Sequence, residues 1–276
     1  MTLLPLAEPY DFEGSTARYR AFGPDLANLW HEGGLHRVVD GREVRIEAAP
    51  GGVDVDPLDD ITEPVVRHVL GGPFDLDGFY AFAANDDVLA PLVHSLTGLR
   101  PPLAPDPYET LVTSITAQQV SLRAAFAIRN RMIERFGARA QHAYAFPTRE
   151  RMATVEPDEL LSLGFSRRKA EYVVGVARSD LDLDRLRYLP DDEVKATLTA
   201  ERGLGEWTAD WFLARHLARP RAWPAGDLGV RKAVSRFVLD GRDAPAAEVR
   251  ALGARFAPWQ NLSVHYLLAG LMVPAG

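Results

Sequence analysis

The sequence predicts an α+β fold, with a small N-terminal antiparallel-sheet domain that carries two helices over residues 1–100 and an all-helical part over residues 101–276. Three observations support this division. Apolar and charged residues alternate around glycine turns near the start of the chain, as they do in half-buried strands. Four prolines lie within residues 100–107 and break regular structure. Almost every later segment repeats its apolar residues with the period of a helix.

The first domain is predicted to contain a β-hairpin. The segment His36–Val39 leads into Asp40–Gly41, and Val44 and Ile46 alternate with charged neighbours beyond it. Asp-Gly suits the two-residue turn of a hairpin, because that turn needs positive φ at both positions. The elements predicted after this hairpin are a glycine turn at residues 50–52, a strand at residues 53–55, and helices around residues 65–70 and 88–96.

The second part is predicted to be a series of amphipathic helices. Leu122, Phe126, Ile133 and Phe136 form one apolar stripe, and Gly137 follows it where a helix C-terminus is expected. Further along the chain, small polar or acidic residues stand where helix N-caps are expected. These caps are Thr148, Asp158 and Ser166, and the later helices are predicted near residues 190–200, 207–217, 227–239, 246–255 and 260–270.

The composition excludes several classes of protein. The chain contains no cysteine, which rules out disulfides, thiolate nucleophiles, cysteine-ligated zinc and cysteine-ligated iron–sulfur clusters. No stretch of it approaches the roughly 18 uncharged apolar residues that a membrane span needs. Glu8, Asp11, Glu13 and Asp25 stand where a secretory signal would be basic and then apolar. We therefore expect a cytoplasmic protein, in the bacterial nucleoid if it acts on DNA, and no membrane partner.

The charge is unevenly distributed along the chain. The net charge is −7, but residues 1–110 hold 7 Arg and no Lys against 19 acidic residues, which leaves 24 basic against 19 acidic residues in the remainder. Residues 121–178 alone carry 11 basic and 6 acidic side chains. A basic run such as Arg167–Lys169 is most often a solvated helix face. Because clustered basic residues are also what phosphate binding requires, the acidic total does not exclude a nucleic-acid partner.

A glycine turn between two helices is a candidate phosphate site. Gly203 and Gly205 separate a helix predicted to end near Ala200 from one predicted to begin about Trp207. Glycine allows positive φ and close approach of the backbone, and the second helix presents free N–H groups. A phosphate fits such a place, where the Thr208 hydroxyl adds a donor. The alternative is a tight turn that needs glycine only for its geometry.

An acid and two tryptophans follow this turn. Asp227 precedes a predicted helix, which makes it a candidate N-cap, and the same position favours an ionised carboxylate. A fixed anion in a cleft can stabilise the sugar cation that forms when a base is cleaved from deoxyribose. Trp207 and Trp211 lie four residues apart on one helix face. They suit stacking on an extruded base, although large aromatic residues are more often part of a core.

Several short motifs are spread over nearly the whole chain. They are Pro9–Phe12, Ile115–Ser121, Leu163–Phe165, Arg168–Ala170, Leu204–Ala209, Pro224 with Asp227, and Pro258–Trp259. In this order and spacing they resemble the helix-hairpin-helix DNA glycosylase superfamily and, within it, the bacterial 3-methyladenine DNA glycosylase II family. The resemblance implies a small antiparallel-sheet domain followed by a helical core whose cleft lies between two lobes.

The resemblance also implies roles for particular residues. Asp227 would be the catalytic carboxylate, and Gln119 would fill the gap that a flipped nucleotide leaves. The base pocket would be formed by Trp207, Trp211, Phe12 and Leu268, and DNA would be bound by Gly203, Gly205, Thr208, Gln119, Ser166, Arg168 and Lys169. No cofactor would be required, but the backbone carbonyls of Thr199, Arg202 and Leu204 are candidates for holding a structural monovalent cation.

Two positions depart from the family pattern. The residue that fills the gap is often leucine in related enzymes and is Gln119 here, and an aromatic residue of the base pocket is replaced by Leu268. Loss of one stacking face is worth about 1–3 kcal/mol per base in proteins that bind single strands. The resemblance therefore leaves the preferred lesion open.

Two absences narrow the activity that the resemblance implies. Bifunctional relatives place a Schiff-base lysine where this chain has Trp207, and the three lysines, Lys169, Lys195 and Lys232, lie outside the turn. The lack of cysteine excludes the iron–sulfur branch. We expect a monomeric, monofunctional glycosylase of base excision repair that hydrolyses alkylated bases, such as 3-methyladenine and 7-methylguanine, from double-stranded DNA. The alternatives are other lesions (1-methyladenine, deaminated or oxidised bases) or a non-catalytic DNA-binding protein.

Overall fold

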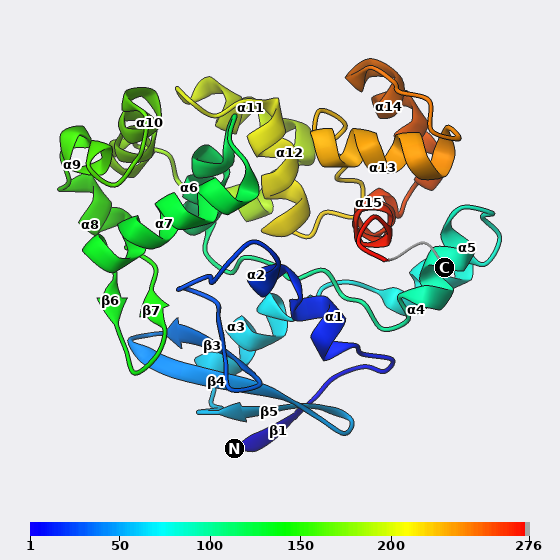
Figure 1. Cartoon of the computed structure of the whole chain (residues 1–276), viewed down its shortest axis with the longest axis horizontal. Helices are drawn as coiled ribbons and strands as arrows, with labels where there is room; N and C mark the ends of the chain where they lie inside the picture. Colours follow the sequence, from blue (N-terminus) through cyan, green and yellow to red (C-terminus); the bar gives the residue numbers. More distant parts are fainter. Residues whose placement is uncertain (274–276) are drawn as a thin grey trace.

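The computed structural model describes residues 1–273 and contains a twisted antiparallel sheet below a helical body (Figure 1). The sheet has five strands in the order β1-β5-β4-β3-β2. The predicted hairpin is formed by β3 and β4, and its turn residues Asp40 and Gly41 have φ of 48° and 72°. The strands are β1 (Thr2–Pro5), β2 (Leu29–His31), β3 (Gly34–Val39), β4 (Arg42–Ala49) and β5 (Gly52–Asp56).

The sheet has a small core of its own. Leu35, Ile46 and Val55 are buried. Buried and more exposed residues alternate in β4 and β5, whereas β3 is buried along almost its whole length. Leu35, Ile46 and Val55 pack in one cluster with Val66 and Val69 of α3 (Thr62–Val69). The apolar faces of the strands and of α3 therefore meet in a single layer, a contact that the predicted elements alone did not specify.

The first hundred residues contain more helices than the two that the sequence predicted. The two predicted segments form α3 and α5 (Leu89–Ser95), and α1 (Phe12–Thr16), α2 (Arg18–Ala21) and α4 (Leu76–Ala83) are additional. Helices α4 and α5 share the hydrophobic core of the helical body, whereas the sheet core ends with Leu70. Tyr80 of α4 hydrogen-bonds Tyr266 of α15 (Gln260–Gly270), with 2.9 Å between their hydroxyl oxygens.

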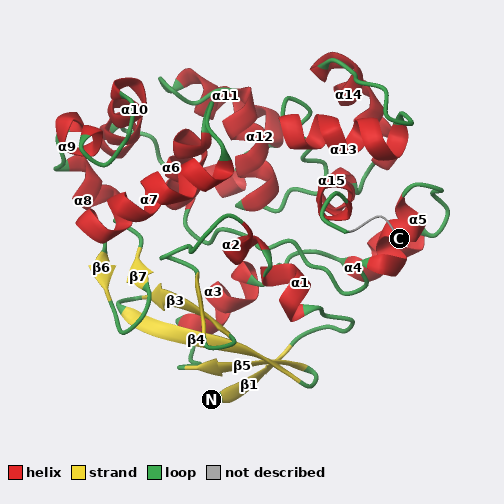
Figure 2. Ribbon diagram, in the orientation of Figure 1, coloured by secondary structure: helices red, strands yellow, loops and turns green. Residues whose placement is uncertain are grey.

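The helical body fills the rest of the chain, apart from a short hairpin, as Figure 2 shows. Its elements are α6 (Pro107–Ala117), α7 (Leu122–Phe136), β6 (Ala138–Arg139), β7 (Tyr144–Ala145), α8 (Arg149–Ala153), α9 (Pro157–Leu161), α10 (Arg167–Arg178), η1 (Arg185–Tyr188), α11 (Asp191–Ala200), α12 (Glu206–Arg215), α13 (Leu228–Val238), α14 (Ala246–Leu252), η2 (Gly253–Phe256) and α15 (Gln260–Gly270).

Most of the predicted helix ends are confirmed, with three corrections. Thr148 and Ser166 cap α8 and α10, but Glu156 caps α9, so that Asp158 lies inside its first turn instead of capping it. Pro107 is not part of the linker: it begins α6, where a proline without an N–H is tolerated. The helix predicted at residues 246–255 becomes a 3-10 helix after Leu252.

A buried ion network joins the sheet to the helices. Arg37 of β3 donates to Glu109 of α6 at 2.5 Å, and Arg129 of α7 donates to Glu109 at 2.7 Å and to Asp25 at 2.5 Å. All four side chains are less than one-tenth exposed. Each charge is therefore compensated by a partner from a distant part of the chain, which fixes how the two cores meet. No helix among residues 1–273 is long and apolar enough to cross a membrane.

Candidate active site

Asp227 stands at the start of α13, as predicted, and accepts four hydrogen bonds. Its Oδ1 accepts from the backbone N–H groups of Gly229 and Val230, at 2.8 and 3.1 Å. Its Oδ2 accepts from the indole N–H groups of Trp207 and Trp211, at 2.8 and 3.1 Å. The carboxylate thus faces the positive end of a helix and two further donors, an arrangement that suits a fixed negative charge.

The two tryptophans therefore hold the acid in place. Trp207 and Trp211 lie one turn apart on α12 and direct their N–H groups to the same oxygen atom. Trp211 is only 4% exposed, and the guanidinium carbon of Arg215 lies 3.6 Å from the centre of its ring. The sequence predicted both rings as base-stacking surfaces. In this structure one face of Trp211 is already covered by an arginine.

Arg215, which the sequence interpretation missed, belongs to the same site. It follows Trp211 by four residues on α12, a spacing that brings side chains together on a helix. Burial lowers the pKa of Arg215 well below its usual range, the positive charge of Arg18 lowers it further, and Asp227 acts in the opposite direction. Burial and the charge of Arg215 lower the pKa of His265, whose ring is 5.9 Å from that of Trp211, to about 3. His265 is therefore neutral at physiological pH.

The other two predicted pocket residues differ in position. Leu268 of α15 lies beside the start of α13. A Cβ placed on Gly229 would be only 3.3 Å from Cδ2 of Leu268. Leu268 is thus next to the helix that Asp227 caps. Phe12, in contrast, is buried in the core of the sheet domain, with its ring centre 5.7 Å from that of Trp30. This packing does not support its assignment to the base pocket.

The glycine turn has two residues with different surroundings. Gly203 has φ of 95°, and a Cβ added to it would lie 2.2 Å from Cγ of Tyr172. Gly205 has φ of −105°, caps α12, and has open space where a Cβ would point. Gly203 is therefore needed for the turn itself, whereas Gly205 leaves the backbone N–H groups at the start of α12 accessible to a ligand.

We expect Gly203→Ala and Gly205→Ala to separate these two roles. Gly203→Ala should lower the melting temperature by several degrees, because it combines a strained φ with a clash against Tyr172. Gly205→Ala should lower the melting temperature only slightly, because alanine is a poorer N-cap than glycine, and should weaken binding to a DNA duplex, since the added methyl group occupies the approach to α12. Thermal unfolding and fluorescence anisotropy with labelled duplex measure the two effects. Unchanged DNA affinity in Gly205→Ala would show that no phosphate binds there.

The predicted wedge residue lies next to this turn. Gln119, in the α6–α7 connection, has φ of 54°, which is uncommon for a residue other than glycine. Its neighbour Gln118 donates from Nε2 to the carbonyl oxygen of Gly203 at 2.9 Å. The structure therefore ties the connection that carries Gln119 to the glycine turn. No local pattern indicates this bond, because its two residues are 85 positions apart.

The remaining predicted DNA-binding residues fall into two groups. Ser166 and Arg168 are exposed at the start of α10. Lys169 is 9% exposed and donates to the carbonyl oxygen of Thr116 at 2.9 Å, and Thr208 is 1% exposed. Burial also lowers the pKa of Lys169. These two side chains are committed to the interior, so the prediction that they contact DNA is not supported.

A cation on the carbonyls of Thr199, Arg202 and Leu204 stays a prediction. All three belong to the end of α11 or the turn after it, where carbonyl groups leave the helical hydrogen-bond pattern. Within residues 1–273 no group of three or more His, Asp or Glu side chains is arranged to hold a metal ion. A cation in this turn would consequently depend on backbone oxygens.

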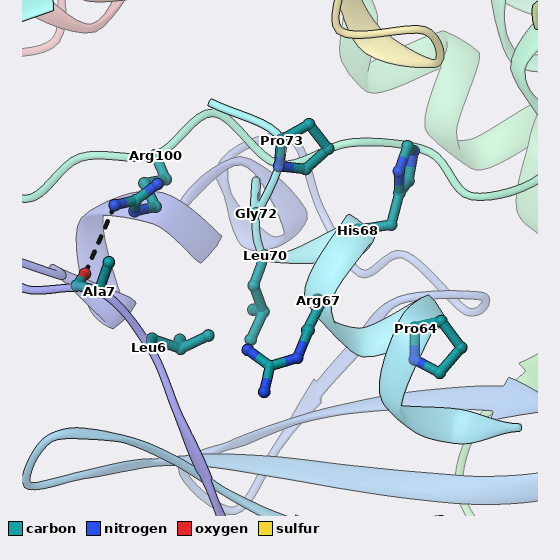
Figure 3. Close-up of a pocket in the computed structure, with 9 residues that line it drawn as sticks. All are labelled: Leu6, Ala7, Pro64, Arg67, His68, Leu70, Gly72, Pro73 and Arg100. Atoms are coloured by element: carbon teal, nitrogen blue, oxygen red, sulfur yellow. Dashed lines mark hydrogen bonds between the residues drawn. The ribbon is translucent and has the colours of Figure 1, made fainter. Parts of the chain in front are cut away.

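A separate cavity of about 330 Å³ is lined by residues of the first hundred positions (Figure 3), and Asp227 is not among them. Its arginines already have partners: Arg67 donates to the carbonyl oxygen of Pro5 at 3.0 Å, and Arg100 donates to that of Phe74 at 2.6 Å. None of the residues predicted for the site lines it. The cavity is therefore unrelated to the arrangement around Asp227.

The fold and the site define a helix-hairpin-helix protein with a fixed carboxylate one helix beyond its hairpin. Residues 112–258 match the family model of the HhH-GPD superfamily base excision DNA repair proteins. The chain belongs to this family, as its motifs indicated.

Individual relatives agree with this assignment. The chain is similar to the DNA-3-methyladenine glycosylase of Bacillus subtilis (29% identity, 74% of this chain and 71% of the relative). It is also similar to a probable bifunctional transcriptional activator/DNA repair enzyme AlkA of Mycobacterium tuberculosis (28% identity, 98% of this chain and 57% of the relative). Among solved structures, a 3-methyladenine DNA glycosylase from Archaeoglobus fulgidus superimposes with a TM-score of 0.86 at 28% identity, covering 97% of each chain.

Proposed function

We propose that this protein is a monofunctional DNA glycosylase of base excision repair, which releases alkylated bases such as 3-methyladenine and 7-methylguanine from double-stranded DNA. The observation that carries the proposal is the Asp227 carboxylate, held by four N–H donors beside the glycine turn. The names of the relatives support the same substrate class. The substrate is expected to be duplex DNA with the damaged nucleotide turned out of the stack.

The proposed reaction is a hydrolysis at C1′ of the sugar. The C1′–N bond breaks and leaves its electron pair on the base, and a water oxygen bonds to C1′. The proton of that water passes to solvent, and an abasic sugar remains. A cationic alkylated base leaves as a neutral molecule, so it needs little help from an acid.

The role of Asp227 in this step is electrostatic. A carboxylate has about four lone-pair sites, and four donors already occupy those of Asp227. The carboxylate is thus better placed to stabilise the positive charge that develops on the sugar than to remove a proton from water. With Trp207 at the position of the Schiff-base lysine of bifunctional enzymes, the strand is left intact.

The partners follow from the same site. The exposed start of α10, the open approach to Gly205 and the turn that carries Gln119 would contact DNA. We propose that one chain acts alone, because one lesion needs one cleft. We also propose that it acts in the cytoplasm. We also propose that no cofactor takes part in the chemistry and that any cation in the hairpin is structural.

Base release from damaged oligonucleotides tests the proposal. Duplexes that contain 3-methyladenine, 7-methylguanine, 1-methyladenine, hypoxanthine or 8-oxoguanine are incubated with the protein, and freed bases are identified by mass spectrometry. The expected result is release of alkylated bases, with strand breaks only after alkali treatment. Salt-sensitive duplex binding without release of any base would instead identify a non-catalytic DNA-binding protein.

A further inference from the structure

The site around Asp227 contains a stacked cation that the proposed reaction does not use. The guanidinium of Arg215 lies 3.6 Å from the ring centre of Trp211, whose indole N–H donates to Asp227. This separation is that of a stacked pair, and guanidinium planes also stack on nucleobases. A base that approaches this face of Trp211 would therefore meet Arg215.

A second arginine lies near the first. Arg18 comes from α2, which lies below the centre of the helical body in Figure 1, and its charge acts on both Arg215 and Asp227. Over residues 1–273, no oxygen atom accepts a hydrogen bond from either guanidinium, and neither forms a salt bridge. Both side chains are half-buried. Among the described residues, two guanidinium groups with unpaired donors thus act on a site that contains one carboxylate.

These charges distinguish two kinds of leaving base. An alkylated purine such as 7-methylguanine is a cation while it is attached to the sugar, so a nearby guanidinium repels it. A neutral base such as hypoxanthine leaves with the electron pair of the broken bond and becomes an anion before it takes a proton from solvent. Guanidinium donors stabilise that developing negative charge on ring nitrogen and carbonyl oxygen atoms.

We propose that Arg215 is a specificity-determining residue that extends base release to neutral damaged bases with acceptor atoms and disfavours cationic ones. This inference rests on the proposed glycosylase function and concerns the leaving base, whereas Asp227 acts on the sugar. Arg18 assists by adding a second positive charge. The stacking on Trp211 gives Arg215 a fixed plane, so that its donors point in set directions when the base arrives.

A comparison of two 6-oxopurines tests this role. Single-turnover release of hypoxanthine and of 7-methylguanine is measured for the wild type, Arg215→Gln and Arg215→Lys. For Arg215→Gln we expect hypoxanthine release to fall about tenfold or more, because a donor to developing charge is lost, and 7-methylguanine release to stay the same or rise. Arg215→Lys keeps the positive charge but loses the planar guanidinium group. Its rate of hypoxanthine release should lie between those of the wild type and Arg215→Gln.

Arg135→Gln is the matched control, because Arg135 also lies over an aromatic ring, Phe136, but is exposed on α7. It should change neither rate. An equal change of both rates in Arg215→Gln and Arg215→Lys, or none, overturns the proposal while leaving the glycosylase function intact. A wild type that releases no base from any duplex overturns the proposed function and this inference with it. Circular dichroism of each variant verifies that it is folded.

Discussion

Asp227→Asn is expected to lower the rate of base release by about 100-fold to 1000-fold, the usual cost of losing one preorganised electrostatic group. The amide is neutral, so the positive charge that develops on the sugar loses its counter-charge. An amide nitrogen would also face the indole N–H groups of Trp207 and Trp211, where the carboxylate accepts two hydrogen bonds. Single-turnover kinetics on a duplex with 3-methyladenine measures the effect.

Asp75→Asn provides the matched control. Asp75 also caps a helix, α4, by accepting from Gly78 at 3.0 Å, but it is not part of the site. Asparagine is an equally good N-cap, so this variant should keep both its stability and its activity. The variant Asp227→Asn should still bind a duplex that contains an abasic site. A folded Asp227→Asn protein with the wild-type rate would rule out the electrostatic mechanism.

Glu109→Gln is expected to reduce the free energy of unfolding by about 3–5 kcal/mol, the typical cost of breaking a buried ion pair. The change removes the negative charge of Glu109, so the buried positive charges of Arg37 and Arg129 are no longer fully compensated. Because the two arginines come from β3 and α7, the loss is expected to loosen the contact between the sheet and the helical body. Chemical denaturation followed by circular dichroism gives the free energy.

An exposed pair serves as the comparison for this prediction. Glu63 and Arg67 lie four residues apart on α3, and their side chains are 42% and 40% exposed. Glu63→Gln should cost at most about 0.5 kcal/mol, because water screens such pairs. If Glu109→Gln were as mild as Glu63→Gln, the buried network would contribute specificity of packing without contributing stability.

The parts of the structure that the sequence predicted are those with strong local signals. Asp40–Gly41 specifies its hairpin turn by backbone conformation alone, and the helix predicted near residues 260–270 is observed as Gln260–Gly270. Asp227 was identified both as an N-cap and as the candidate acid, because the spacing from the glycine turn is a local property of the chain. The family resemblance then supplied the arrangement of the lobes.

The parts that the sequence did not reveal depend on contacts between distant residues. Strand β1 has no alternating pattern of its own and is defined by pairing with β5, some fifty positions later. Lys169 lies in a basic run that suggested DNA contact, yet its ammonium group is used to hold the end of α6. Arg215 is an exception, because its four-residue spacing from Trp211 on the predicted helix is a local signal that could have found the pair. Its place beside Asp227 depends on the bond from Trp211 to a residue 16 positions away.

The hydrogen bond from Gln118 to Gly203 has a consequence for how damage is found. A repair protein must inspect a large excess of sound nucleotides, so time spent at each one matters. This bond joins the connection that carries the predicted wedge residue Gln119 to the turn that is predicted to hold the DNA backbone. Moving one turn without the other costs about 1 kcal/mol, the net contribution of one hydrogen bond. We therefore expect probing of the base stack and grip on the backbone to be coupled by about that amount.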